Sequence, residues 1–360
     1  MKKRWTALLL ALAMLSALAV GALADEQKKD ETAAEETAQT APDAEGTLRF
    51  ENLSARMKTG YYTVMSLEEN IAAIECIDYD KMYEDLRDNL NLIADYQWGM
   101  IQAGQSGSYA YETLEQRYNN ARKTFDDIKD GKLQKDYADT VRQLRNMQDS
   151  LTAMGESLYV NLLSLEDQSA ALIRQTAALD RTIEEVKLRY ELGQVSAMTL
   201  QQTEAGKAQV ESGKAAIDAA AAQLRRQLNA MIGEELTAPL TLNALPEVTA
   251  EQLAAMDVEK DLEKAKAASY DLYAAKLTLE DADEEYKDKA GDLGYNKDNY
   301  EYIAVKHQWQ AAQYTYNAAV QNFELSFRSL YDSVQSYASA LNAAKVSLEC
   351  ERSDLAAAQL

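Results

Sequence analysis

Apolar residues recur every seven positions through the middle of the chain. They lie in a segment without proline between Pro42 and Pro239. A proline breaks a helix, and a seven-residue repeat is typical of helices that pack along one another. The repeat comprises Leu144, Leu151, Leu158, Leu165, Leu172, Leu179 and Val186. It predicts a long helix over about 136–191.

The repeat stops around a glycine and then resumes. Its second part is Val210, Ile217, Leu224 and Met231, which predicts a return helix over about 199–232. Gly193 can take the left-handed conformation that ends a helix, and Thr199 with Gln202 has the spacing of a capping box. The two segments therefore predict a long antiparallel coiled-coil helical hairpin whose tip lies at Gly193.

A second set of helices is expected after a linker at 234–250. One helix should cover about 257–289, and a second long helix should begin near Asn299. The second helix carries two apolar rows, Trp309, Tyr316, Phe323, Leu330, Tyr337 and Ala344 on one and Val320, Phe327, Val334, Leu341 and Leu348 on the other. The sequence thus predicts an all-α fold of tandem repeats, the first over about 66–233 and the second, over 251–360, incomplete.

The first residues have the layout of a secretory signal peptide over 1–24. A basic start precedes an apolar stretch and Ala22-Leu23-Ala24. We expect a cleaved signal and export to the cell envelope, with an uncleaved membrane anchor as the alternative. Residues 25–46 are acidic and hold no large apolar side chain, which favours a disordered tether.

An elongated helical domain should follow over 47–360. Its first residues predict a short extended lead-in. A helix should then begin at Ser66, where Glu69 completes a capping box, and continue to about Trp98.

Charge and composition exclude several classes of function. The formal net charge of −22 argues against nucleic acid or anionic lipid as a main partner. The one histidine, His307, and the two cysteines, Cys76 and Cys350, lack the spacing of metal ligands. Phosphate-binding glycine loops and nucleophile elbows are absent from the sequence. We therefore expect no enzyme, no metal and no cofactor, and leave open whether the cysteines pair.

The segment from Leu188 to Gly233 resembles the repeat of the TolC family, the trimeric outer-membrane efflux ducts. The resemblance rests on Arg189-Tyr190, Gly193, Val195-Ser196, Leu200, and an Ala- and Gln-rich return helix ending in Leu224, Leu228 and Gly233. In that family this segment closes the duct and meets a periplasmic adaptor protein. The resemblance implies an adaptor-facing hairpin tip made of Arg189, Tyr190, Leu192, Gly193, Gln194, Val195 and Ser196.

The resemblance also implies a homotrimer that works with a membrane fusion protein as adaptor and an inner-membrane pump. The break at 290–300 is rich in Gly, Asp, Asn and Lys and too short for the two membrane strands of each family repeat. We therefore expect a barrel-less relative that acts in export. The alternative is a structural or adhesive coiled-coil envelope protein without transport activity, which would not require the Arg-Tyr-x-x-Gly tip.

Overall fold

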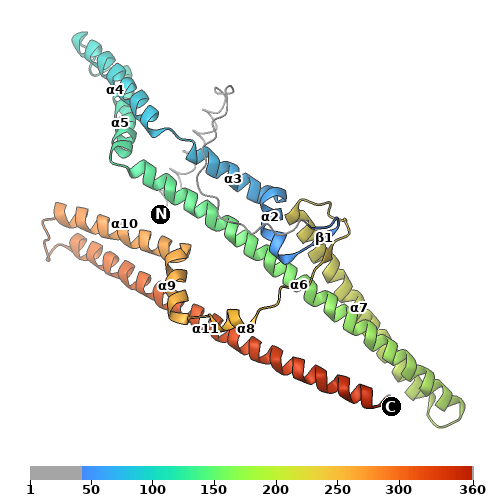
Figure 1. Ribbon diagram of the computed structural model, residues 1–360. Helices are drawn as coiled ribbons and strands as arrows, with labels where there is room; N and C mark the ends of the chain where they lie inside the picture. Colours follow the sequence, from blue (N-terminus) through green and yellow to red (C-terminus); the bar gives the residue numbers. More distant parts are fainter. Residues whose placement is uncertain (1–42, 359–360) are drawn as a thin grey trace. The chain divides into compact units, whose positions relative to one another are not determined.

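The computed structural model describes residues 43–358, and helices make up almost all of this part of the chain (Figure 1). The prediction of an all-α fold is confirmed. The expected signal peptide and residues 25–42 of the expected tether lie outside the described residues. The last tether residues are described, and the Asp43 side chain is only 5% exposed. Residue 43 of the expected tether therefore has a buried side chain.

Two short helices occupy the segment for which an extended lead-in was predicted. Only β1 (Thr47–Leu48) is extended there, and α2 (Phe50–Gly60) and α3 (Tyr62–Glu75) follow it. The predicted helix start at Ser66 is wrong, because Ser66 lies inside α3. Helical spacing of the buried residues explains the difference: Leu53 and Met57 in α2, and Val64, Leu67 and Ile71 in α3.

The next two helices, α4 (Tyr79–Gln102) and α5 (Tyr109–Lys129), pack against each other. The Tyr83 and Phe125 rings stack between them with centroids 4.4 Å apart. The prediction of one helix from Ser66 to Trp98 is wrong, since residues 76–78 interrupt the helix between α3 and α4. Asp78 caps the new helix, because its carboxylate accepts a hydrogen bond from the Lys81 backbone N–H at 2.9 Å.

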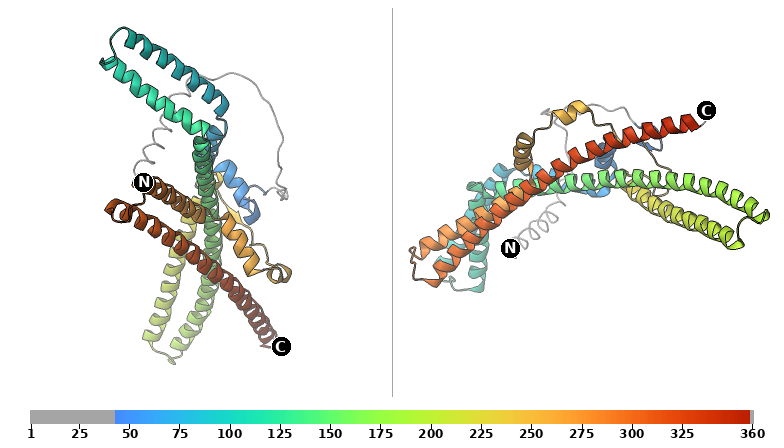
Figure 2. Two further views of the ribbon diagram at one scale, coloured as in Figure 1. Left: turned by 90° about the vertical axis from the view of Figure 1, so that its left-hand side faces the viewer. Right: turned by 90° about the horizontal axis from the view of Figure 1, so that it is seen from below.

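The longest helix, α6 (Lys132–Glu191), packs along α7 (Ala197–Ile232), as Figures 1 and 2 show. Polar contacts join the two helices at several levels. Successive pairs are Glu166–Arg225 at 2.5 Å, Ser169–Asp218 at 2.6 Å, Asp180–Lys207 at 2.6 Å and Lys187–Glu204 at 3.4 Å. Residue numbers rise on α6 as they fall on α7, so the two helices run antiparallel.

The remaining elements are β2 (Thr241–Leu242), α8 (Ala250–Ala254), α9 (Val258–Ala268), α10 (Tyr270–Asp292) and α11 (Tyr300–Ala358). The predicted continuous helix over 257–289 is wrong, because Ser269 separates α9 from α10. Ser269 is extended (φ −65°, ψ 120°), and its hydroxyl accepts a hydrogen bond from the Leu272 backbone N–H at 3.3 Å. The helix α10 then packs against α11, where Tyr286 stacks on Trp309.

The main apolar core lies where α2, α6 and α7 meet the two short strands. The strands are parallel, with Thr47 opposite Thr241 and Leu48 opposite Leu242. The core consists of Leu48, Leu53, Met57, Tyr159, Leu162, Ala221, Leu228, Met231, Ile232, Leu240 and Leu242. Since these residues come from the segments before α6 and after α7 as well as from the two helices, the core holds the base of the α6–α7 pair.

Candidate functional site

The turn between α6 and α7 closes through backbone hydrogen bonds. Gly193 has a φ of +69°, a conformation that favours glycine. Its N–H donates to the Tyr190 carbonyl at 2.9 Å, and the Gln194 N–H donates to the Arg189 carbonyl at 2.8 Å. These bonds satisfy carbonyls that the last turn of α6 would otherwise leave without partners. The turn is therefore short and well defined.

The start of α7 differs from the predicted capping box. Ser196 is the N-cap, and its hydroxyl accepts a hydrogen bond from the Thr199 backbone N–H at 3.2 Å. The prediction that Thr199 and Gln202 form the cap is wrong, because Thr199 already lies in the helix. Ser196 satisfies the Thr199 N–H instead of the Gln202 N–H, so the helix begins earlier than predicted.

Apolar side chains are exposed around this turn. We call residues 188–200 the hairpin tip. The exposed fractions are 57% for Leu188, 45% for Tyr190, 64% for Leu192 and 66% for Met198. Val195 and Leu200 are half-buried. The tip thus presents an apolar surface to solvent. None of the four exposed side chains belongs to the main apolar core.

The predicted tip residues fall into two groups. Leu192, Gly193, Gln194, Val195 and Ser196 form the connection between the helices, and Arg189 and Tyr190 lie in the last turn of α6. Arg189 forms an ion pair with Glu185 on the same helix. The sequence interpretation missed Leu188 and Met198. The sequence feature that could have identified them as exposed tip residues is that both are large and apolar and lie outside the seven-residue rows.

Ion pairs between the helices hold the region below the tip. Lys207 lies 2.6 Å from Asp180 on α6 and 3.4 Å from Glu211 on its own helix. The hydrogen bond to Asp180 is the main cause that raises the pKa of the Lys207 ammonium above its usual value. The pair between Lys207 and Asp180 contributes modestly to stability and agrees with the antiparallel pairing of α6 and α7.

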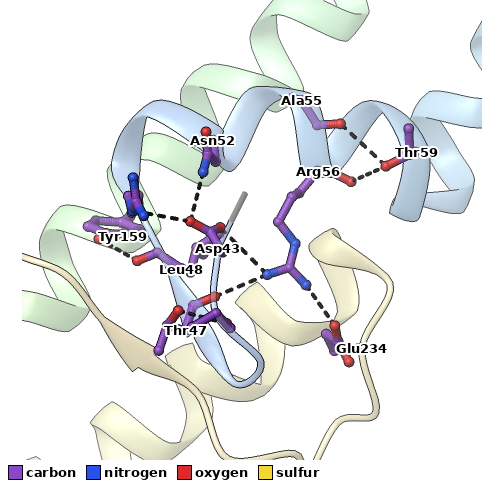
Figure 3. Close-up of polar contacts among 11 residues, drawn as sticks. Asp43, Thr47, Leu48, Asn52, Ala55, Arg56, Thr59, Tyr159 and Glu234 are labelled. Carbon is purple, nitrogen blue, oxygen red and sulfur yellow. Dashed lines mark hydrogen bonds and ion pairs between the residues drawn. The ribbon is translucent and has the colours of Figure 1, made fainter. Parts of the chain in front are cut away.

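A network of polar contacts secures the opposite end of the α6–α7 pair (Figure 3). The Asp43 carboxylate accepts a hydrogen bond from Asn52 at 2.7 Å and lies 3.8 Å from the Arg56 guanidinium. Arg56 also donates to the Thr47 carbonyl at 3.2 Å and to Glu234 at 2.6 Å. One arginine therefore joins β1 and α2 to the segment that follows α7.

Tyr159 supports this network from within α6. The side chain is fully buried, and its hydroxyl lies 2.9 Å from the Leu48 carbonyl (Figure 3) and 2.7 Å from the Asn243 carbonyl. A tyrosine hydroxyl has one proton, so it donates to one of these carbonyls at a time. Burial is the main cause that raises the pKa of Tyr159. The hydroxyl links both strands to the middle of α6.

Metal ligands, membrane spans and cysteines complete the description of the candidate chemistry. Within residues 43–358, no grouping of His, Cys, Asp and Glu could hold a metal ion. Across the same residues, none of the helices combines the length and apolar character needed to cross a membrane. Cys76 and Cys350 are both exposed and free. The hairpin tip therefore offers exposed apolar side chains and one arginine for contact with other molecules.

Comparisons with known proteins give no assignment for this site. The chain matches no protein-family model, no curated protein and no solved structure.

Proposed function

We propose that this chain is a subunit of an export duct similar to those of the TolC family, and that its hairpin tip docks a membrane fusion protein. The observation that carries the proposal is the group of exposed apolar side chains, Leu188, Tyr190, Leu192 and Met198, around the closed turn at Gly193. Exposed apolar groups of this kind, next to charged residues, mark surfaces that bind protein partners.

The composition of the tip supports a protein partner. Tyrosine and arginine are enriched among the residues that contribute most to binding at protein interfaces, and Arg189 and Tyr190 lie side by side here. A coiled coil that serves only for extension or adhesion would not require apolar side chains at its turn. That structural role is the competing function, and the exposed apolar tip favours docking over it.

The helices below the tip support assembly of several copies. Exposed small residues on α7 would let a neighbouring helix approach closely. They are Ala205, Gly213, Ala219 and Ala220. Large apolar residues of α11 are also exposed, among them Tyr314 at 72% and Leu325 at 72%. In the proposed homotrimer these surfaces pack against the next copy, and an inner-membrane pump supplies the substrate through the adaptor.

Photo-crosslinking in living cells tests the docking step. A photoreactive amino acid in place of Leu192 should form a crosslink to a membrane fusion protein. The same amino acid in place of Ile173, which is 54% exposed on α6 away from the tip, is the control and should not. Crosslinking from both positions, or from neither, would contradict docking at the tip.

Substitutions at Gly193 test whether docking supports export. Gly193→Glu introduces strain and charge and should abolish both the crosslink and resistance to exported compounds. Gly193→Asn should retain both, because asparagine tolerates the left-handed conformation. Export by the Gly193→Glu variant at the level of the unmodified protein would favour the structural alternative.

A further inference from the structure

The end of the α4–α5 pair almost lacks charge. Asp95 is the one charged residue from Asn89 to Tyr111, whereas charged residues make up 27% of the whole chain. We call residues 89–111 the uncharged tip. The turns of the other two helix pairs have charged residues close by. Arg189 and Glu191 come just before the α6–α7 turn, and Lys289 and Asp298 lie on either side of the end of α10. Exposure to water at a helical turn therefore does not explain the missing charges.

Large apolar side chains project from the uncharged tip into solvent. The exposed fractions are 55% for Leu92, 62% for Tyr96, 62% for Trp98, 43% for Ile101 and 85% for Tyr109. Between the helices lies a short loop, in which Gly104 is left-handed and the Ser108 hydroxyl caps α5. The apolar residues are thus gathered close to the end of the pair.

The exposed residues lie on both sides of the packed face of α4. Ile93, Gln97 and Met100 are half-buried and share one face at a helical spacing. With about 3.6 residues per turn, Leu92 and Tyr96 lie on one side of that face, and Trp98 and Ile101 lie on the other. A protein partner docked on one side would leave the other side in water. A surrounding apolar medium would cover both.

We propose that the uncharged tip inserts into the interfacial region of a bilayer of electrically neutral lipids. Tryptophan and tyrosine are enriched at that depth, because their rings are apolar and carry a polar group. Leu92 to Ile101 extends about 14 Å along the helix, less than the ~30 Å of a bilayer core, so the tip enters one leaflet without crossing. The net charge of −22 opposes binding to anionic lipid.

The fluorescence of Trp98 tests this insertion in the full chain. Trp5→Phe and Trp309→Phe leave Trp98 as the one tryptophan. Phosphatidylcholine vesicles should shift its emission to shorter wavelength, and brominated lipid in the same vesicles should quench it. Because the emission comes from residue 98, binding through the apolar stretch near the N-terminus does not contribute. Leu92→Ser with Ile101→Ser should weaken partitioning about tenfold or more.

The matched control is Leu236→Ser with Leu245→Ser, which removes two aliphatic side chains of similar exposure, 56% and 41%, from the segment after α7 and should leave the shift unchanged. Both sets of substitutions affect exposed positions, so circular dichroism should show the same helix content. Three results overturn the proposal: unchanged Trp98 emission with phosphatidylcholine, a shift that requires phosphatidylglycerol, or a shift that follows protein concentration without vesicles. The last result would assign the surface to self-association.

Discussion

At the scale of single residues, two glycines allow a close contact between backbones. A Cβ on Gly60 would lie 2.2 Å from the Ile232 carbonyl oxygen, and one on Gly233 would lie 2.7 Å from the Gly60 Cα. The obstacles are backbone atoms, which cannot move aside as a side chain can. The end of α2 and the end of α7 therefore meet with no side chain between them.

Gly60→Ala should lower the free energy of unfolding by about 2 kcal/mol, because the added methyl group forces these backbones apart. Urea denaturation followed by circular dichroism measures the change. Gly206→Ala is the control: its Cβ meets no atom within 4 Å among residues 43–358, and it should stabilise α7 by up to about 1 kcal/mol. Equal effects of the two substitutions would contradict the contact.

Tyr159→Phe should cost about 1 to 3 kcal/mol, since a buried carbonyl loses its donor. The substitution should also change the response to alkali. Burial raises the pKa of Tyr159 in the folded state. Its contribution is therefore fully present below the unfolded pKa of about 10 and is lost as pH rises through the higher folded value. Denaturation across pH 8 to 12 should show a shallower alkaline decline for Tyr159→Phe than for the unmodified chain.

At the scale of helices and strands, sequence reasoning succeeded where a pattern is long. The seven-residue row ending at Val186 indicated α6, and α6 does end at Glu191. The breaks at Asp78 and Ser269 were missed because each depends on one side chain capping the next helix, and such residues are also common on helix surfaces. The contacts of Arg56 were missed because Glu234 lies 178 residues away.

Ile183→Asp should loosen the outer half of the α6–α7 pair. Ile183 is 7% exposed, so the substitution places an unpaired charge between the helices. Hydrogen exchange of the backbone amides from about 176 to 210 should become faster, while the amides around Tyr159 should stay protected. Ile173→Asp introduces the same charge on the same helix at an exposed position, and it should leave exchange unchanged.

At the scale of the whole molecule, α11 leaves the outer residues of both its apolar rows without cover in the described residues. Tyr337 is 75% exposed, Leu341 54% and Leu348 51%. Residues of this type at a seven-residue spacing pack against other helices. The seven-residue period indicated the two rows in the sequence. The period could not specify which residues would cover them.

Light scattering of the purified protein should give three times the mass of one chain, because copies of the protein cover these rows in the proposed trimer. Leu341→Asp with Leu348→Asp should reduce the mass to that of one chain at unchanged helix content. Asn342→Asp with Ser347→Asp adds the same charge at exposed polar positions and should preserve the trimer. A mass of one chain for the unmodified protein would contradict the proposed duct.

The contact between Gly60 and Gly233 has a mechanical consequence. With bare backbone on both sides, the end of α7 lies directly against the end of α2, where the main core and the Arg56–Glu234 ion pair also hold it. From this contact α7 extends for 36 residues, or about 50 Å. An angular error of about 5° at the contact would displace the far end of α7 by roughly 5 Å at that length. A base without play is therefore what keeps the turn at Gly193 in a reproducible position.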